Sequence, residues 1–245
     1  MYHFFVQPEQ VNEKEIVIYG EDVNHIGNVL RMKPKEKLLI SAGGIDYLCE
    51  IDKISREEVY LSILKQNENS MELPVKITLY QGIPKAEKME LIIQKAVELG
   101  ASRIVPVMTK RVIVKLDEKK ARTKVARWQA IAEAAAKQSR RSTIPEVTFP
   151  ISFVQALEES SSSNQRFIPY ELASGMENTR KLLKAVVPGD EISIFIGPEG
   201  GFEEEEIQMA IERKVKPITL GRRILRTETA GFVVLSNLMI AVDVD

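Results

Sequence analysis

The chain has 245 residues, a formal net charge of −1 and a single cysteine, Cys49. This length allows one large domain or two smaller ones with cores of their own, and one cysteine excludes an intramolecular disulfide. The longest apolar stretch, residues 232–242, is too short to cross a bilayer. The first residues show no basic region followed by a long apolar core, and the two histidines have no partners at metal-ligand spacing. We therefore expect a cytoplasmic protein without a membrane segment, a secretory signal or a metal.

Short apolar or alternating runs predict strands in the first seventy residues, at 16–19, 37–41, 47–51 and 59–64. Cys49 lies in the third of these strands and is interpreted as a packing thiol. One helix is predicted over residues 22–32, where four apolar side chains recur at helical spacing. Strands at this spacing predict a small β-barrel domain over residues 1–70, with a polar linker near its end.

From residue 74 onward, strands and helices alternate. The predicted strands cover residues 75–80, 103–108, 166–170, 191–196 and 217–220. The predicted helices cover residues 88–99, 118–139, 178–187, 203–213 and 229–242. Such alternation predicts an α/β domain over residues 74–245, with a parallel sheet covered by helices on both faces. The last helix is apolar nearly all round, so it must be buried inside the domain or against another subunit.

Positive charge is concentrated in residues 110–141. This stretch holds eleven Lys or Arg residues and three acids, a local charge of +8, which leaves −9 for the rest of the chain. Such separation is typical of a polyanion-binding face on an otherwise acidic protein. A solvated helix surface is the alternative.

A glycine-rich turn, residues 197–201, follows the predicted strand 191–196 and precedes a helix that opens with four glutamates. Ligands of α/β sheets bind where parallel strands end, and glycines let backbone groups approach them. The spacing matches neither the dinucleotide-binding nor the phosphate-loop pattern. Four acids at a helix start suit the helix dipole but would repel a pyrophosphate. The turn therefore indicates a neutral or cationic ligand, with a plain tight turn as the alternative.

A second segment of this kind, residues 220–230, follows the predicted strand 217–220 and precedes the last helix. Two ligand-type loops after neighbouring strands indicate a site more strongly than either loop alone. Thr227, Glu228 and Thr229 could also form a helix cap. Capping and ligand binding are compatible, so both interpretations stay open here.

Gly-Pro-Glu-Gly-Gly-Phe at 197–202, followed by Leu-Gly-Arg-Arg-Ile-Leu-Arg-Thr-Glu-Thr-Ala at 220–230, resembles the SPOUT class of methyltransferases, the α/β-knot enzymes. Within this class the chain resembles the RsmE family, the small-subunit ribosomal RNA uracil-N3 methyltransferases. Residues 85–100, the long helix and residues 25–31 are also similar to that family. One departure is Ser139-Arg140-Arg141, where family members often carry a small residue or glycine before a single arginine. Which of the two arginines, Arg140 or Arg141, contacts RNA stays open.

The resemblance implies a deep trefoil knot in the C-terminal domain, an exception to the rule against knots. It also implies a homodimer through the knot domain, an RNA-binding N-terminal barrel of the PUA or OB type, and S-adenosylmethionine as cofactor. The positive sulfonium of this cofactor agrees with the acidic helix start. The implied cofactor-binding residues are Glu171, Leu172, Ile196, Gly197, Glu199, Gly200, Gly201, Leu220, Gly221, Ile224, Leu225, Arg226, Thr229 and Ala230.

The implied reaction is methylation of N3 of a specific uridine in small-subunit (16S) ribosomal RNA. Uracil N3 must lose its proton at or before attack, so a base or a cation that stabilises the uracil anion would help. We predict Arg226 and Arg111 as the cation and Glu228 as the base, with helix capping as the alternative for Glu228. RNA binding is assigned to the barrel, through Arg31, and to the basic stretch, through Arg111, Lys115, Arg140 and Arg141.

Two other functions stay open at this point. A knot methyltransferase could act on transfer-RNA guanine or on a ribose 2′-hydroxyl, although the arginine motif typical of the ribose-methylating branch is not evident after Tyr80. Alternatively, the chain could be an RNA-binding assembly factor with a vestigial cofactor site. The product nucleoside distinguishes the first alternative, and cofactor binding distinguishes the second.

Overall fold

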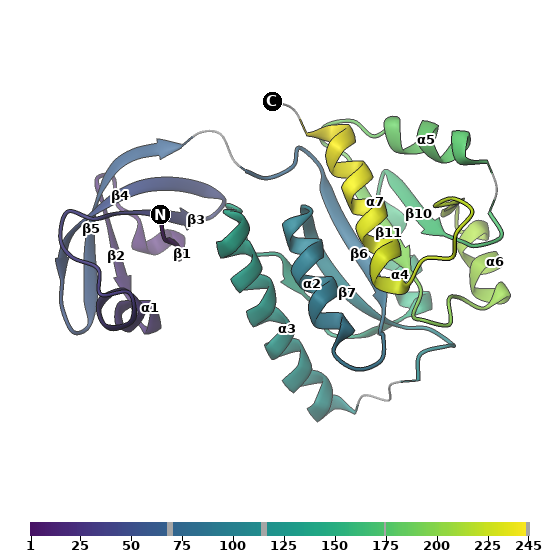
Figure 1. The fold of residues 1–245 in the computed structure, drawn as a ribbon, viewed down its shortest axis with the longest axis horizontal. Coiled ribbons are helices and arrows are strands. Elements are labelled where there is room, and N and C mark those ends of the chain that lie inside the picture. The colour runs from purple at the N-terminus through teal and green to yellow at the C-terminus, as the bar shows by residue number, and fades with distance from the viewer. Residues whose placement is uncertain (68–70, 114–116, 174, 244–245) are drawn as a thin grey trace. The chain divides into compact units, whose positions relative to one another are not determined.

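The computed structural model describes residues 1–67, 71–113, 117–173 and 175–243 (Figure 1). The chain forms two compact units: Met1–Glu72 with Ala136–Ile144, and Leu73–Ala135 with Pro145–Asp245. The predicted domains, residues 1–70 and 74–245, placed the second piece of the first unit, Ala136–Ile144, in the second domain. Their boundaries stay a prediction.

The first unit is built on a five-stranded sheet in the order β1-β3-β4-β5-β2. Its strands are β1 (His3–Phe5), β2 (Glu15–Tyr19), β3 (Lys37–Ala42), β4 (Ile45–Ile54) and β5 (Glu58–Asn67). Strand β1 pairs parallel with β3, and the other neighbours are antiparallel. Alternate side chains, such as Ile16 and Ile18 or Leu38 and Ile40, are fully buried, as expected for a half-buried strand.

The predicted helix 22–32 is shorter and less regular than expected. A short 3₁₀ turn, η1 (Pro8–Gln10), comes before it along the chain. The observed elements are α1 (Glu21–Asn24) and the π-helical turn η2 (His25–Val29), which bury Val23 and Ile26. Arg31 then adopts a left-handed conformation with φ of 53°, which ends the helical path.

The second unit contains a parallel sheet in the order β12-β10-β11-β6-β7-β8, with β9 also paired to β7. The strands are β6 (Lys76–Gly82), β7 (Ala101–Met108), β8 (Glu146–Val147), β9 (Ile151–Ser152), β10 (Gln165–Pro169), β11 (Glu191–Ile196) and β12 (Lys216–Ile218). The alternation of strands and helices therefore predicted the sheet type correctly. Strands β8 and β9 were not predicted.

Helices cover this sheet. They are α2 (Lys88–Glu98), α3 (Glu118–Ser139), α4 (Phe153–Glu159), α5 (Met176–Lys184), α6 (Glu204–Glu212) and α7 (Thr227–Val242), with a 3₁₀ turn, η3 (Ser160–Ser162), after α4. Helices α2 and α7 contact one another, and α7 contacts β11 (Figure 1). Residues from α4 and α6, among them Phe153 and Ile207, pack with Tyr80 of β6 and Phe195 of β11. Of the helices in the described part of the chain, none is long and apolar enough to span a membrane.

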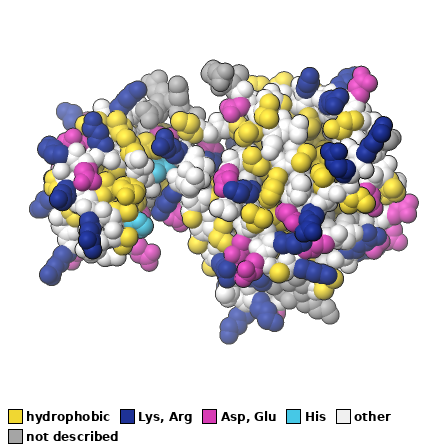
Figure 2. Space-filling model, in the orientation of Figure 1, with side chains coloured by type: hydrophobic (Ala, Val, Ile, Leu, Met, Phe, Trp, Pro, Cys, Tyr) yellow, Lys and Arg dark blue, Asp and Glu magenta, His cyan; other side chains and the backbone are white. Residues whose placement is uncertain are grey.

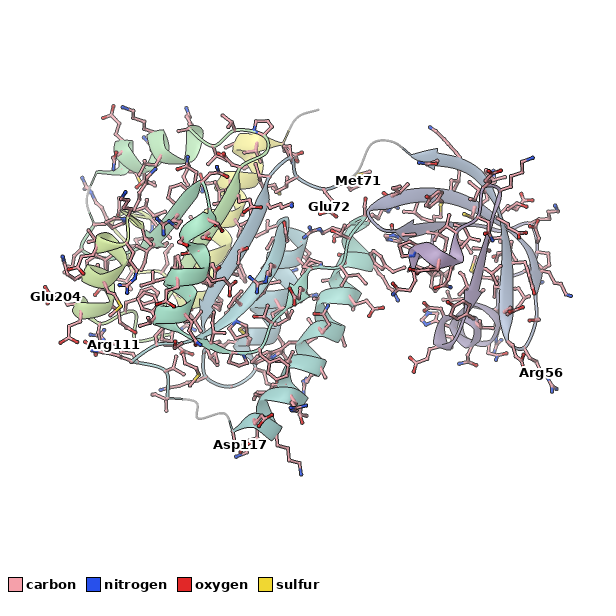
Figure 3. All side chains as sticks on the ribbon, turned by 180° about the vertical axis from the view of Figure 1, so that it is seen from behind. Arg56, Met71, Glu72, Arg111, Asp117 and Glu204 are labelled. Atoms are coloured by element: carbon pink, nitrogen blue, oxygen red, sulfur yellow. The ribbon has the colours of Figure 1, made fainter. Side chains whose placement is uncertain are left out.

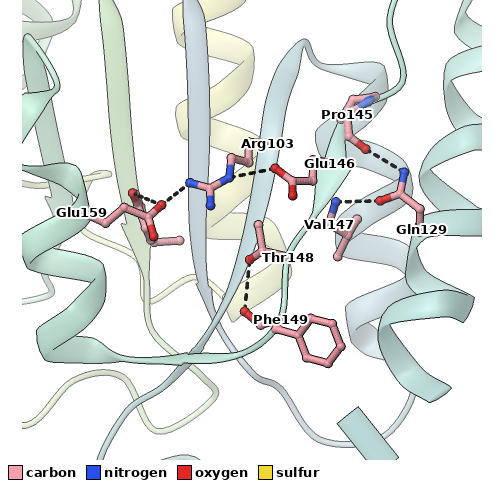
Figure 4. A network of polar contacts seen from close by, with 9 residues as sticks. Arg103, Gln129, Pro145, Glu146, Val147, Thr148, Phe149 and Glu159 are labelled. Carbon is pink, nitrogen blue, oxygen red and sulfur yellow. Dashed lines mark hydrogen bonds and ion pairs between the residues drawn. The ribbon is translucent and has the colours of Figure 1, made fainter. Parts of the chain in front are cut away.

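Side chains hold the short strand β8 in place (Figure 4). Arg103 of β7 forms ion pairs with Glu146 of β8, at 3.2 Å, and with Glu159 of α4. Gln129 of α3 accepts a hydrogen bond from the Val147 amide at 2.8 Å and donates to the Pro145 carbonyl at 3.1 Å. These contacts explain why a two-residue strand without its own sequence pattern forms at this edge.

Candidate functional site

One pocket of about 200 Å³ lies where β10, β11 and β12 end. Three loops surround it: the one after β10, the glycine-rich turn after β11 and the segment between β12 and α7. The lining residues are Pro169, Tyr170, Glu171, Ile196, Gly197, Pro198, Glu199, Gly200, Gly201, Phe202, Thr219, Leu220, Gly221, Arg222, Arg223, Ile224, Leu225, Thr227 and Ala230. The carboxyl end of the parallel strands is thus where the pocket forms, as α/β sheets favour.

The turn at 197–201 is tight, and its glycines are required by its shape. The Gly201 amide donates to the Pro198 carbonyl at 2.9 Å, and Gly201 is left-handed with φ of 69°. A Cβ atom on Gly197 would lie 3.0 Å from the backbone of Gly201. Gly82, at the end of β6, packs against the same turn, because its Cβ would lie 2.6 Å from Pro198 Cδ. The glycines of the turn therefore present backbone to the pocket.

The acids at the start of α6 bond to the protein itself. Glu206 is 3% exposed, and its carboxylate accepts from the Glu203 and Lys110 amides, both at 2.9 Å. Glu203 pairs with Arg111, and Glu205 pairs with Lys110. The guanidinium of Arg111 holds the pKa of Glu203 below its usual range. A helix start occupied by its own carboxylates does not present a phosphate site.

The turn after β11 is bonded to the start of α7. The Thr227 hydroxyl donates to the Gly197 carbonyl at 2.6 Å, and the Gln81 side-chain amide donates to the Thr227 hydroxyl at 2.9 Å. Gln81 is fully buried, and its Oε1 has no hydrogen-bond partner among the described residues. The sequence predictions missed Gln81, which directly follows the predicted strand 75–80; a polar residue at the carboxyl end of a parallel strand is a signal that could have identified it.

Lys88 of α2 lies between two carboxylates beside the pocket. Its Nζ is 3.0 Å from Glu199 Oε1 and 3.8 Å from Glu228 Oε2. Burial alone would raise the pKa of Glu199, but hydrogen bonds from Lys88 and the Lys85 amide outweigh it and hold that pKa below its usual range. Glu228 Oε2 is buried and accepts no hydrogen bond from the described residues. Lys88 had no predicted role.

The predicted cofactor-binding residues line the pocket with three exceptions, Leu172, Arg226 and Thr229. Leu172 is 74% exposed on the loop after β10. Arg226 is exposed at the N-cap of α7, and Thr229 lies in its first turn. The structure thus brings most of the predicted set together, and their role in binding stays a prediction.

Arg111, a predicted catalytic cation, does not line the pocket. Its guanidinium donates to both carboxylate oxygens of Glu203 and to the Gly200 carbonyl. Glu228, the predicted base, is half-buried in the first turn of α7, and no side chain forms a cap hydrogen bond there among the described residues.

The predicted RNA-binding arginines differ in their surroundings. Arg31 and Arg140 are exposed, both with left-handed backbone conformations. Arg141 is 4% exposed, and its Nε donates to the carboxylate of Glu72 at 3.1 and 3.2 Å. Lys115 lies outside the described residues. Arg140 is therefore the arginine of this pair that is available to a ligand.

The basic stretch 110–141 contains many ion pairs. The pairs with neighbouring acids are Lys110–Glu205, Arg111–Glu203, Lys120–Asp117, Arg122–Glu118, Arg127–Glu90 and Lys137–Asp22. On the face of the second unit in Figure 2, Lys and Arg are interspersed with Asp and Glu. The charge separation of the sequence is therefore weaker on this surface than along the chain.

Two family models match the chain. Residues 71–239 match the RNA methyltransferase domain, and residues 18–64 match the RNA methyltransferase PUA domain. Together with the parallel sheet and the glycine-bounded pocket at its carboxyl end, these matches define the class of the chain as an RNA methyltransferase.

Relatives narrow the class. A ribosomal RNA small subunit methyltransferase E of Bacillus subtilis (strain 168) is 36% identical over 243 residues, which are 96% of this chain and 95% of the relative. The structure of an enzyme of that name from Neisseria gonorrhoeae, bound to S-adenosylmethionine, is 34% identical with a TM-score of 0.83, over 96% of this chain and 95% of that one. A methyltransferase from Legionella pneumophila, in complex with the same cofactor, is 32% identical with a TM-score of 0.84, over 98% and 97%. The chain belongs to the ribosomal RNA small subunit methyltransferase E family.

Proposed function

We propose that the chain is an S-adenosylmethionine-dependent methyltransferase that methylates N3 of a specific uridine in 16S ribosomal RNA. The observation that carries this proposal is the pocket between the turn 197–201 and the segment 220–230. The Thr227–Gly197 hydrogen bond joins the turn to the segment. Homologues named ribosomal RNA small subunit methyltransferase E, one of them bound to the cofactor, support this proposal. The proposed location is the cytoplasm.

The residues of the pocket fit this cofactor. Gly197, Gly200 and Gly201 leave backbone groups accessible, and Glu171 supplies negative charge for a sulfonium, whereas the charge of Glu199 is balanced by Lys88 at 3.0 Å. Arg222 and Arg223 are exposed in the same lining and are available to anionic groups of the cofactor or the RNA. Together with Leu220 to Leu225, these residues would hold the cofactor, which supplies an activated methyl group when bound.

We assign the removal of the proton from uracil N3 to Glu228, as the general base. One carboxylate oxygen of Glu228 is buried without a hydrogen-bond partner among the described residues, and Lys88 Nζ lies 3.8 Å from it. Glu228 does not line the pocket itself but follows Thr227, which does, so a base bound at that edge of the pocket would give its N3 proton to this acceptor. The absence of a side-chain cap at α7 favours this role over capping.

We assign stabilisation of the uracil anion to Arg226, which is exposed at the N-terminus of α7. The dipole of α7 adds positive potential at the same end. Arg111, the other predicted cation, is bonded to Glu203 and Gly200, and therefore we do not give it this role.

The knot, the closed N-terminal barrel and the homodimer are parts of the same proposal. Support for the knot comes from α7: β12 lies at the edge of the sheet, but the chain then returns so that α7 contacts β11 in its interior. Support for a dimer comes from Ile240 of α7 and Leu91 of α2, which are 75% and 44% exposed on two helices that contact one another. Residues 1–70 would bind RNA through Arg31, the basic stretch 110–141 would add Lys115 and Arg140, and residues 74–245 would transfer the methyl group.

The test is methyl transfer by the purified protein to small-subunit RNA that lacks the modification. We expect incorporation by the wild type and a loss of about 100-fold or more in turnover for Glu228→Gln and Arg226→Ala. Cofactor binding is measured separately for each variant, so that a binding defect is not mistaken for a chemical one. Near-wild-type turnover in both variants would contradict the two assignments.

A further inference from the structure

Arg111 connects the loop after β7 to the glycine-rich turn after β11. Its Nε and Nη2 donate to the two carboxylate oxygens of Glu203 at 2.9 and 3.0 Å, and its Nη1 donates to the Gly200 carbonyl at 2.5 Å. Its Cδ and Cβ would lie 3.2 and 3.3 Å from a Cβ atom on Gly200. Figure 3 shows Arg111 beside α6, which contains the labelled Glu204. The guanidinium and the aliphatic stem of Arg111 therefore both contact the turn.

The residue before Arg111 strengthens this connection. The Lys110 amide donates to Glu206 at 2.9 Å, and the Lys110 ammonium pairs with Glu205. Glu206 in turn accepts from the Glu203 amide at 2.9 Å. Three of the four glutamates that begin α6 are thus bonded to two successive residues of the loop after β7.

These contacts determine what Arg111 can do. Nε, Nη1 and Nη2 all donate to the turn or to Glu203, and neither Lys110 nor Arg111 lines the pocket. A guanidinium in a two-bond pair with a carboxylate offers little net charge to a polyanion. Arg111 is therefore poorly placed to bind RNA phosphate or the reacting base.

We infer that Arg111 is a positioning residue, which fixes the turn 197–202 in the shape that accepts the cofactor. This inference rests on the proposed function, because it assigns S-adenosylmethionine to the pocket. A turn that is ordered before binding loses less conformational freedom when the ligand arrives. Loss of Arg111 should therefore weaken cofactor binding and leave RNA binding unchanged.

The experiment uses the full chain and four variants, Arg111→Met, Arg111→Lys, Glu203→Gln and the Arg111→Met/Glu203→Gln double variant. Calorimetry measures the affinity for S-adenosylmethionine, and fluorescence anisotropy measures the affinity for a small-subunit RNA fragment. We expect each single variant to bind the cofactor about three- to tenfold more weakly, since the pair is partly exposed. The double variant should be no weaker than the weaker single variant, because both changes remove one interaction.

Glu203→Gln distinguishes positioning from RNA contact. If Arg111 contacted RNA, removing the negative charge of Glu203 would strengthen RNA binding. The Arg111→Lys variant, which keeps the positive charge, would then bind RNA as the wild type does. The control is the exposed Arg122–Glu118 pair on α3, changed to Arg122→Met and Glu118→Gln, which should leave cofactor affinity within about twofold. Thermal unfolding of each variant confirms that it is folded.

Cofactor affinities within twofold of the wild type in both Arg111→Met and Glu203→Gln would overturn the inference. So would a loss of RNA affinity in Arg111→Met that Arg111→Lys restores. No binding of S-adenosylmethionine by the wild type would instead overturn the proposed function, and the inference with it.

Discussion

The hydroxyl of Thr227 donates a hydrogen bond of 2.6 Å to the carbonyl of Gly197, which ties the first residue of α7 to the first residue of the glycine-rich turn. Gln81, at the end of β6, donates to the same hydroxyl at 2.9 Å. Two segments thirty residues apart in the sequence thus meet at Thr227, whose side chain is buried, with 5% of the residue exposed. The two sides of the pocket depend on this contact for their relative position.

Thr227→Val retains the shape of the side chain but removes both hydrogen bonds. The Gly197 carbonyl and the Gln81 amide then lose a partner inside the fold, which costs about 1–3 kcal/mol. We expect about tenfold weaker binding of S-adenosylmethionine by calorimetry. Thr123→Val on α3, whose hydroxyl is exposed and donates to the Lys119 carbonyl, is the matched control. Unchanged affinity in Thr227→Val would show that this bond does not shape the pocket.

Gly82→Ala should displace the turn from behind, since Gly82 itself does not line the pocket. The new Cβ would lie 2.6 Å from Pro198 Cδ and 2.7 Å from the Pro198 nitrogen, so the turn must move. We expect loss of measurable cofactor binding while the circular dichroism spectrum stays that of the wild type. Gly231→Ala in α7 is the control, since its Cβ would meet no atom closer than 3.8 Å. Cofactor binding by Gly82→Ala as tight as that of the control would refute the prediction.

Arg140→Gly should stabilise the protein. The end of α3 has the Schellman pattern, with the Arg141 amide bonded to the Ala136 carbonyl and the Arg140 amide to the Lys137 carbonyl. Arg140 is left-handed there, with φ of 59°, a conformation that costs a non-glycine residue about 1 kcal/mol. Urea unfolding should show a gain of this order for Arg140→Gly and no gain for Arg140→Ala. Equal stability of the two variants would mean that the charge of Arg140, rather than its backbone conformation, determines the change in unfolding free energy.

The same two variants test the RNA contact proposed for Arg140. Both remove the guanidinium, so both should bind small-subunit RNA more weakly and with a shallower salt dependence. The RNA affinity and the unfolding free energy thus change independently. Wild-type RNA affinity in both variants would remove Arg140 from the proposed interface.

Cys49 should respond to pH in a defined direction. Burial raises the pKa of its thiol to about 12, above the value of an unfolded cysteine. The folded state therefore retains the proton where the unfolded state loses it, so this contribution to stability is complete below about pH 8.5 and declines as the pH rises toward 12. The slope of unfolding free energy against pH between about 8.5 and 11 should be shallower for Cys49→Ala than for the wild type. Identical slopes for the two proteins would contradict the raised pKa of the Cys49 thiol.

Elements with strong sequence patterns were predicted well. The predicted bounds of α3 and β11 agree with the observed ones, because a long alanine-rich helix and a strand buried on both faces have distinct patterns. Strands β1, β8 and β9 have two or three residues, too few for a pattern. Helix α4 was also missed, although Ser152 and Gln155 form a capping box at its start.

The predicted site depended on local segments, and those segments do meet at one pocket. What the sequence could not reveal are contacts between distant residues. Gln81 bonds to Thr227 across 146 positions, and Arg111 bonds to Gly200 across 89. Similarly, charge alone did not distinguish buried Arg141, which pairs with Glu72, from exposed Arg140. Side-chain roles of this kind follow from tertiary packing, which local spacing does not encode.

The most direct test of the central claim is mass spectrometry of nucleosides from small-subunit RNA of a strain that lacks this protein. We predict that one 3-methyluridine disappears and that the wild-type gene restores it, whereas the Glu228→Gln gene does not. An unchanged level of 3-methyluridine, or the loss of a methylated guanine or a 2′-O-methylated nucleoside in its place, would contradict the proposed function.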